Sequence, residues 1–161
     1  MIEWSLRPKE LSYNINPAFC GEILYYVISE YTKKLNMGFD SIYLPFIFPV
    51  IFNSQIAGEL KSTNSNFCKI LSDNAHLKIN FAESTSNYFE VMFETVLFLA
   101  KLEVIKFEDN KIYINKKIKK RNLKYLNNDI KFYMSKAKIL GKVLANENEP
   151  SNLYYLWGIK L

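Results

Sequence analysis

Residues 104–115 read Val-Ile-Lys-Phe-Glu-Asp-Asn-Lys-Ile-Tyr-Ile-Asn, and this stretch decides the fold class. Apolar and polar side chains alternate on both sides of Asp109-Asn110, which is the period of a half-buried strand. Asp and Asn also tolerate the left-handed backbone that a two-residue hairpin turn requires. The stretch therefore predicts a β-hairpin. Because helical spacing dominates elsewhere, we expect a mostly α fold with a small β-hairpin, an α+β domain.

Two helices are predicted immediately before this hairpin, a short one over 67–74 and a longer one over 81–102. Short helix, longer helix and hairpin (103–115) follow one another in the order of a winged helix-turn-helix, so we predict a winged-helix-like domain, although many α+β domains share this order. The longer helix is expected to place its apolar side chains along one face. These side chains are Phe89, Met92, Phe93, Val96, Leu97 and Ala100.

The first helix is predicted to begin at Asn16-Pro17, because Asn is a good N-cap and Pro suits the first helical position. It is expected to run to about Asn36 and to end at Gly38, a residue type that commonly caps helix C-termini. The apolar block over 42–52 should be irregular as far as its first proline and then form a buried helix reaching about Leu60.

The C-terminal third predicts a long helix over 126–145 and, after a polar loop, a closing aromatic tail over 153–158. Neither an internal repeat nor a linker composition is visible, so we expect one domain over 1–161. Its parts are an N-terminal arm (1–16), a helical part (17–102), a hairpin (103–116), and the C-terminal helix with the aromatic tail (121–161).

Composition restricts the class of protein. The chain has 161 residues, of which 49% are hydrophobic and 23% charged, as in globular domains. No stretch approaches the roughly 20 apolar residues that cross a bilayer, and the N-terminus lacks the layout of a secretory signal. Cys20 and Cys68 are too few for a disulfide framework, so both are expected to be reduced. We therefore expect a cytoplasmic protein without a membrane partner.

The residue types that carry catalysis or bind metals are sparse. His76 is the single histidine and has no second histidine or nearby cysteine to complete a metal site. Cys20 is expected on the apolar side of the first helix, where a thiol is inert. Five glycines in the whole chain provide no phosphate-cradling loop. We expect no catalytic residues, no cofactor and no metal, and hence not an enzyme.

A basic segment follows the predicted hairpin, in a chain with a formal net charge of +5. If the hairpin is a wing, these side chains could contact nucleic-acid phosphates; otherwise they form a solvated lead-in to the last helix, which we favour. The residues concerned are Lys116, Lys117, Lys119, Lys120, Arg121 and Lys124. The longer helix carries Glu83, Glu90 and Glu94, which argues against reading a DNA major groove. A free-standing winged-helix DNA-binding protein is thus the alternative hypothesis.

Several motifs carry a resemblance to a known family. They are Trp4, Arg7-Pro8-Lys9-Glu10, Asn16-Pro17-Ala18-Phe19-Cys20, Leu140-Gly141-Lys142 and Leu153-Tyr154-Tyr155-Leu156-Trp157-Gly158. Together they resemble the middle component of three-component ABC systems, a bacterial conflict-system family, over nearly the whole chain.

The resemblance implies a non-catalytic scaffold or regulatory subunit. It would bridge an ABC ATPase of the SMC or Rad50 kind and an effector subunit in an anti-phage or anti-plasmid complex, similar to the small subunit of Lamassu-type systems. DNA would be reached through the assembled complex. Aromatic and Arg side chains are favoured in interface hot spots, so the arm and the tail are the expected partner-binding segments. The residues are Trp4, Arg7, Glu10, Tyr154, Tyr155 and Trp157.

Overall fold

The computed structural model describes residues 16–64, 66–79, 81–119, 127–147 and 149–158. Its helices and strands follow in chain order. They are α2 (Pro17–Leu35), β1 (Phe39–Asp40), the 3₁₀ helix η2 (Ser41–Tyr43), α3 (Leu44–Phe52), α4 (Ser54–Glu59), α5 (Phe67–Asp73), the 3₁₀ helix η3 (Ala75–Lys78), α6 (Phe81–Lys101), β2 (Ile105–Glu108), β3 (Lys111–Ile114), α7 (Asn128–Leu144) and α8 (Pro150–Trp157). The prediction of a mostly α fold with a small β element is confirmed.

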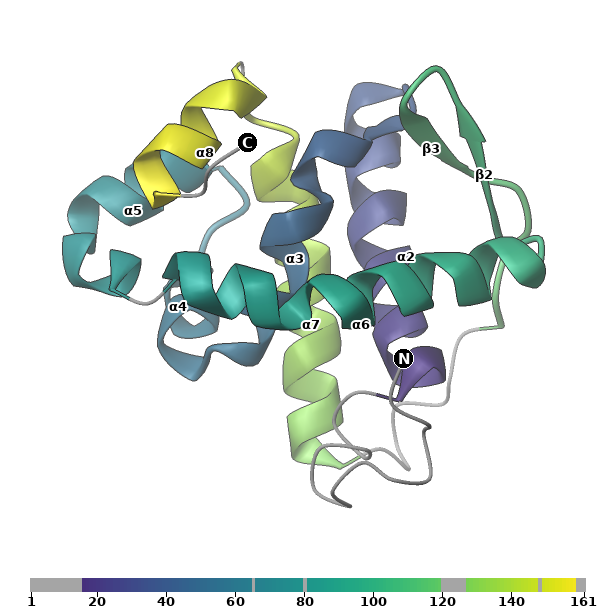
Figure 1. Cartoon of the computed structure of the whole chain (residues 1–161), viewed down its shortest axis with the longest axis horizontal. Coiled ribbons are helices and arrows are strands. Elements are labelled where there is room, and N and C mark those ends of the chain that lie inside the picture. The colour runs from purple at the N-terminus through teal and green to yellow at the C-terminus, as the bar shows by residue number, and fades with distance from the viewer. Residues whose placement is uncertain (1–15, 65, 80, 120–126, 148, 159–161) are drawn as a thin grey trace.

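Helix α2 is the central element, and α6 crosses in front of it and of α7 (Figure 1). The Asn16 side chain accepts a hydrogen bond from the Ala18 N–H at 2.8 Å, so the predicted N-cap is correct. The helix ends at Asn36, which adopts the left-handed conformation with φ of 53°. Asn36 therefore takes the capping position that the sequence assigned to Gly38. Gly38 instead faces the Tyr113 ring, which a Cβ at this position would meet at 2.6 Å.

Helices α2 and α7 pack closely along much of their length. Gly141 of α7 lies against the α2 backbone, where a Cβ would stand 2.3 Å from the Val27 carbonyl oxygen. A side chain at this position is excluded by backbone atoms, which cannot rotate away. The glycine therefore sets how closely the two helices approach.

The apolar block folds into two helices rather than one. Pro45 occupies the first turn of α3, where its missing N–H has no helical partner to lose, and Pro49 lies inside α3. The chain leaves the helix at Asn53, whose side chain accepts hydrogen bonds from the N–H groups of Gln55 and Ile56 and so begins α4. The predicted continuous helix to Leu60 was therefore wrong at Asn53.

Within the described residues, three short strands form one antiparallel sheet in the order β1-β3-β2. The hairpin turns at Asp109 and Asn110, with φ of 48° and 60°, as the sequence predicted. The two-residue strand β1 pairs Phe39 with Ile112 and was not predicted. Both residues are fully buried, so this pairing joins the hairpin to the core beside α2.

The aromatic tail forms α8, which lies beside α5 at the end of the molecule opposite the hairpin (Figure 1). The Trp157 ring stacks on Phe67 with centroids 4.9 Å apart and contacts Phe81 at 3.9 Å. The Tyr154 hydroxyl donates a hydrogen bond to the Ile42 carbonyl oxygen at 2.7 Å. The tail thus closes the core at this end.

Candidate protein-interaction site

The outer side of α6 exposes a row of large apolar side chains. Phe89, Phe93 and Leu97 lie four residues apart, so they stack on one face of the helix. Their exposed fractions are 65%, 55% and 41%, whereas Met92 and Val96 of the same helix are buried. The predicted apolar stripe of this helix is therefore only partly a core stripe. Its remainder faces outward.

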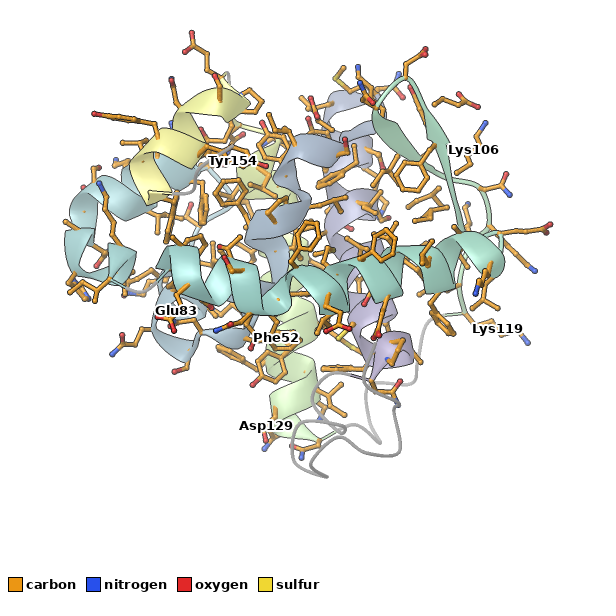
Figure 2. The ribbon with its side chains drawn as sticks, in the orientation of Figure 1. Phe52, Glu83, Lys106, Lys119, Asp129 and Tyr154 are labelled. Carbon is orange, nitrogen blue, oxygen red and sulfur yellow. The ribbon has the colours of Figure 1, made fainter. Side chains whose placement is uncertain are left out.

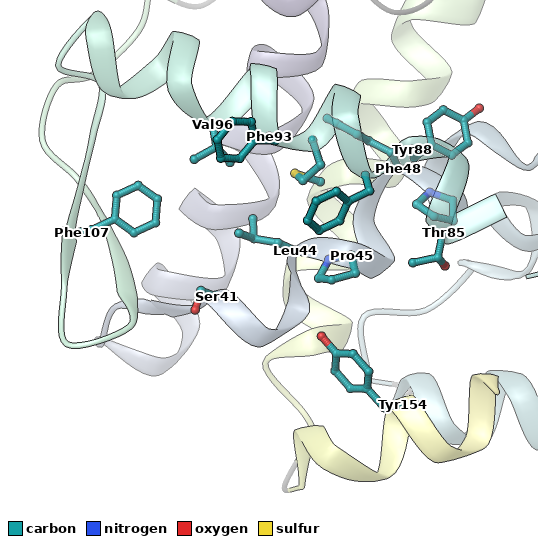
Figure 3. Close-up of a pocket in the computed structure, with 13 residues that line it drawn as sticks. Ser41, Leu44, Pro45, Phe48, Thr85, Tyr88, Phe93, Val96, Phe107 and Tyr154 are labelled. Atoms are coloured by element: carbon teal, nitrogen blue, oxygen red, sulfur yellow. The ribbon is translucent and has the colours of Figure 1, made fainter. Parts of the chain in front are cut away.

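A groove of about 390 Å³ runs beside this row (Figure 3). Leu44, Pro45 and Phe48 of α3 line it together with Met92 and Val96 of α6. Phe89 and Phe93 stand at its α6 edge. We call this surface, with Phe107 described next, the aromatic groove.

Phe107 closes the hairpin side of the aromatic groove. Figure 3 shows its ring projecting from the hairpin toward α6. Side chains alternate along a strand, so Lys106 and Glu108 point to the other face of β2, where they form an ion pair of 2.6 Å. Phe107 itself is 48% exposed although it lines the groove. The hairpin thus contributes a third half-exposed ring.

The hydroxyl groups of Thr85, Tyr88 and Tyr154 in the aromatic groove either donate a hydrogen bond within the protein or stay protonated at neutral pH. Thr85 Oγ1 donates to the Phe81 carbonyl oxygen at 2.9 Å, and the Tyr154 hydroxyl donates to Ile42. Burial is the main cause that raises the pKa of Tyr88 and of Tyr154 above the usual tyrosine value. A lining of aromatic, aliphatic and neutral hydroxyl groups suits apolar side chains of a partner rather than proton transfer.

The sequence-predicted partner-binding residues fall into different places. Trp4, Arg7 and Glu10 lie outside the residues that the structure describes. Of the tail, Trp157 is 1% exposed and Tyr154 is 7% exposed, because both fill the core, whereas Tyr155 is 88% exposed (Figure 2 labels Tyr154). Of the expected aromatic surface patch, only Tyr155 is therefore exposed in this conformation. Partner binding by Tyr155 stays a prediction.

The described part of the basic segment is exposed. Lys116, Lys117 and Lys119 all project into solvent after β3, and Lys119 is labelled in Figure 2. The other three predicted nucleic-acid contacts lie outside the described residues, so their role stays a prediction. They are Lys120, Arg121 and Lys124.

The residues considered for catalysis do not converge. His76 is exposed on η3, and Cys20 is fully buried, which raises the pKa of its thiol to about 12 although a hydrogen bond with Thr95 acts in the opposite direction. Among the described residues, no group of three His, Cys, Asp or Glu side chains could hold a metal ion. The arrangement offers surface for binding.

The comparison with protein families identifies the chain. Residues 4–161 match the model of the ABC-three component (ABC-3C) system Middle Component 3. The chain belongs to this family. The family resemblance inferred from the sequence motifs is thereby confirmed, and this middle component has ABC-system components as its partners. No curated protein and no solved structure matches it. None of the helices described for the middle component is long and apolar enough to span a membrane.

Sequence reasoning missed the aromatic groove of the middle component. The one available signal was Phe89, Phe93 and Leu97 at four-residue spacing, beside the second apolar row formed by Met92 and Val96. A helix with apolar residues over so broad an arc has more apolar side chains than one core face can bury. The contribution of Phe107 could not be found this way, because it depends on how the hairpin folds over α6.

Proposed function

We propose that this middle component is a non-catalytic scaffold subunit that bridges an SMC- or Rad50-like ABC ATPase and an effector subunit in a bacterial anti-phage or anti-plasmid complex of the Lamassu type. It acts in the cytoplasm, and DNA reaches it through the assembled complex. The family match over residues 4–161 supports the place beside an ABC component. The nature of the ATPase, the effector and the defence role are our proposal.

The observation that carries the scaffold role is the set of three half-exposed rings around the aromatic groove, Phe89, Phe93 and Phe107. Contiguous exposed apolar surface of this kind marks binding sites, and aromatic side chains dominate interface energies. Together the three rings expose on the order of 300 Å² of apolar surface. At about 25 cal/mol per Å², covering them provides roughly 8 kcal/mol before the costs of association are subtracted.

Acidic side chains border the row on α6. Glu83 and Glu90 are exposed on the same helix, and Glu90 follows Phe89 directly. An apolar groove with an acidic edge fits a partner segment that presents aliphatic or aromatic side chains and carries Lys or Arg beside them. We therefore propose that such a segment of a partner component docks into the aromatic groove.

Co-expression tests this proposal. The full chain would be expressed with the ABC ATPase of the same system and, separately, with its effector subunit, and the mass of each purified species would be measured by light scattering. The proposal predicts a stable hetero-complex. A chain that elutes alone from both the ATPase and the effector would contradict it. The double variant Trp4→Ala/Arg7→Ala and the single variant Tyr155→Ala then show whether the arm or the tail contributes.

A free-standing winged-helix DNA-binding protein is the second candidate. The short helix α5 and the longer helix α6 precede the hairpin of β2 and β3, which is the order that suggested this candidate from the sequence. The outer side of α6 argues against this candidate. In a winged helix this side would enter the DNA groove, but it carries Phe89, Phe93 and Glu90. Carboxylates on that face repel phosphates, so we rank this candidate below the scaffold.

A further inference from the structure

A second groove of about 390 Å³ lies between α2, α7 and the segment after β3. Four lysines from these three elements converge on it: Lys33 of α2, Lys117 of the segment after β3, and Lys138 and Lys142 of α7. Sequence reasoning points only to Lys117 among them. We call this surface the lysine groove. It shares no residue with the aromatic groove.

The charge of the lysine groove is positive. In the described part of the chain its acidic lining residue is Glu30, whose carboxylate pairs with Lys33 at 2.8 Å and with Lys142 at 3.4 Å. Burial raises the pKa of Glu30, but the hydrogen bonds and charges of these two lysines outweigh burial and leave the pKa below its usual value. Glu30 is therefore ionised at neutral pH, and four ammonium groups face one carboxylate.

The helix dipole accounts for only two of these four lysines. Lys33 and Lys142 lie in the last turns of α2 and α7, where cations are favoured by the helix dipole. Lys138 lies nearer the middle of α7, with its ammonium 4.7 Å from the centre of the Tyr26 ring, and Lys117 follows β3 outside any helix. The helix dipole therefore does not explain the positive charge at these two positions, although the Tyr26 ring gives the Lys138 ammonium one contact within the fold.

The two tyrosines that line the lysine groove indicate which kind of anionic ligand it can bind. Tyr25 and Tyr26 are only 8% exposed each and pack edge to face with centroids 5.9 Å apart. Their ring faces are therefore not open platforms for stacking a base, which single-stranded nucleic acids and free nucleotides commonly use. The polar groups that line the groove are the four ammonium groups, the Glu30 carboxylate and the Ser29 side chain. This suits phosphates approached without contact to bases.

From this geometry we infer that the lysine groove binds the phosphate backbone of double-stranded nucleic acid without reading its sequence. The inference goes beyond the scaffold proposal and does not depend on it. Because the two grooves are lined by different residues, a protein partner on the aromatic groove and a duplex on the lysine groove can be held together.

Fluorescence anisotropy of a labelled DNA duplex with the purified full chain tests the inference between about 50 and 200 mM salt. The test variant is Lys117→Gln/Lys138→Gln. The control, Lys69→Gln/Lys78→Gln, removes the same charge from exposed lysines on α5 and η3, at the other end of the molecule. Each phosphate contact contributes about 0.9 to the slope of log affinity against log salt, so the test variant should lower the slope by about 2.

The expected result is weaker duplex binding, on the order of tenfold or more, for the test variant and near wild-type binding for the control. Equal losses in the two variants would overturn the inference, because overall charge and not the groove would then be responsible. A failure of the wild-type chain to bind the duplex at low salt, tighter binding of a single strand of the same sequence, or equally effective competition by polyglutamate would each also overturn it.

Discussion

Replacing Gly141 by Ala tests the packing of α7 on α2, the two helices that line most of the lysine groove. The new Cβ would stand 2.3 Å from the Val27 carbonyl oxygen and 3.1 Å from its carbon, whereas ordinary contacts begin at 3.4 Å. The helices would have to separate by about 1 Å. Such overpacking costs about 1–3 kcal/mol, and a rigid backbone neighbour places this case near the upper end. Ala gains about 1 kcal/mol over Gly in a helix interior. The free energy of unfolding should therefore fall by about 2 kcal/mol.

Two other helical glycines provide matched controls. A Cβ added at Gly58 would have no atom within 4 Å, so Gly58→Ala should gain up to about 1 kcal/mol from helix propensity alone. At Gly21 the nearest atom is Leu99 Cδ2 at 3.0 Å, the end of a flexible side chain, so Gly21→Ala should stay within about 1 kcal/mol of the wild type.

Urea unfolding followed by far-ultraviolet circular dichroism measures all three variants. From most to least stable, the expected order is Gly58→Ala, then wild type and Gly21→Ala, then Gly141→Ala. In a thermal unfolding experiment, the midpoint of Gly141→Ala should lie about 4–8 °C below that of the wild type. If Gly141→Ala were as stable as Gly58→Ala, the close approach of α7 to α2 would be refuted.

Three further changes probe contacts elsewhere. Tyr154→Phe removes the hydrogen bond to the Ile42 carbonyl oxygen and should lower the free energy of unfolding in urea by about 1 kcal/mol. Asn53→Ala removes the cap of α4 and should cost about 1 kcal/mol in the same assay. Because the folded-state pKa of Glu30 is depressed, its stabilising effect is present above its ordinary pKa of 4.5 and is lost as pH falls below it. The stability difference between wild type and Glu30→Gln should therefore shrink on acidification; a difference that is the same at neutral and acid pH would contradict this.

The parts of the fold that local chemistry determines could be predicted from the sequence. The Asn16 cap and the turn at Asp109 and Asn110 each depend on the backbone preferences of one or two residues, and both are where the sequence placed them. Strand β1 could not be predicted, because two residues carry no period and Phe39 pairs with a partner far along the chain. The break at Asn53 was missed because an apolar run favours a continued helix.

The candidate site was less predictable than the fold. Periodicity shows that a helix has an apolar side but not which part of a broad apolar arc the neighbouring helices cover. Phe93 and Met92 are adjacent and similar in hydrophobicity, yet α3 buries Met92 and leaves Phe93 half exposed. The same reasoning applies to Trp157, an aromatic residue that could serve a core or an interface and is buried here by Phe67 and Phe81.

The most direct test of the scaffold proposal compares two exposed phenylalanines in binding to the other components of the system. Phe93, 55% exposed, lies on the aromatic groove, and Phe132, 38% exposed, lies on α7 away from it. Calorimetry with the purified ATPase and effector should show Phe93→Ser weakening one of these complexes by about 2 kcal/mol, roughly thirtyfold, while Phe132→Ser binds like the wild type. Wild-type affinity of Phe93→Ser for both components would contradict the proposal that the aromatic groove holds the assembly together.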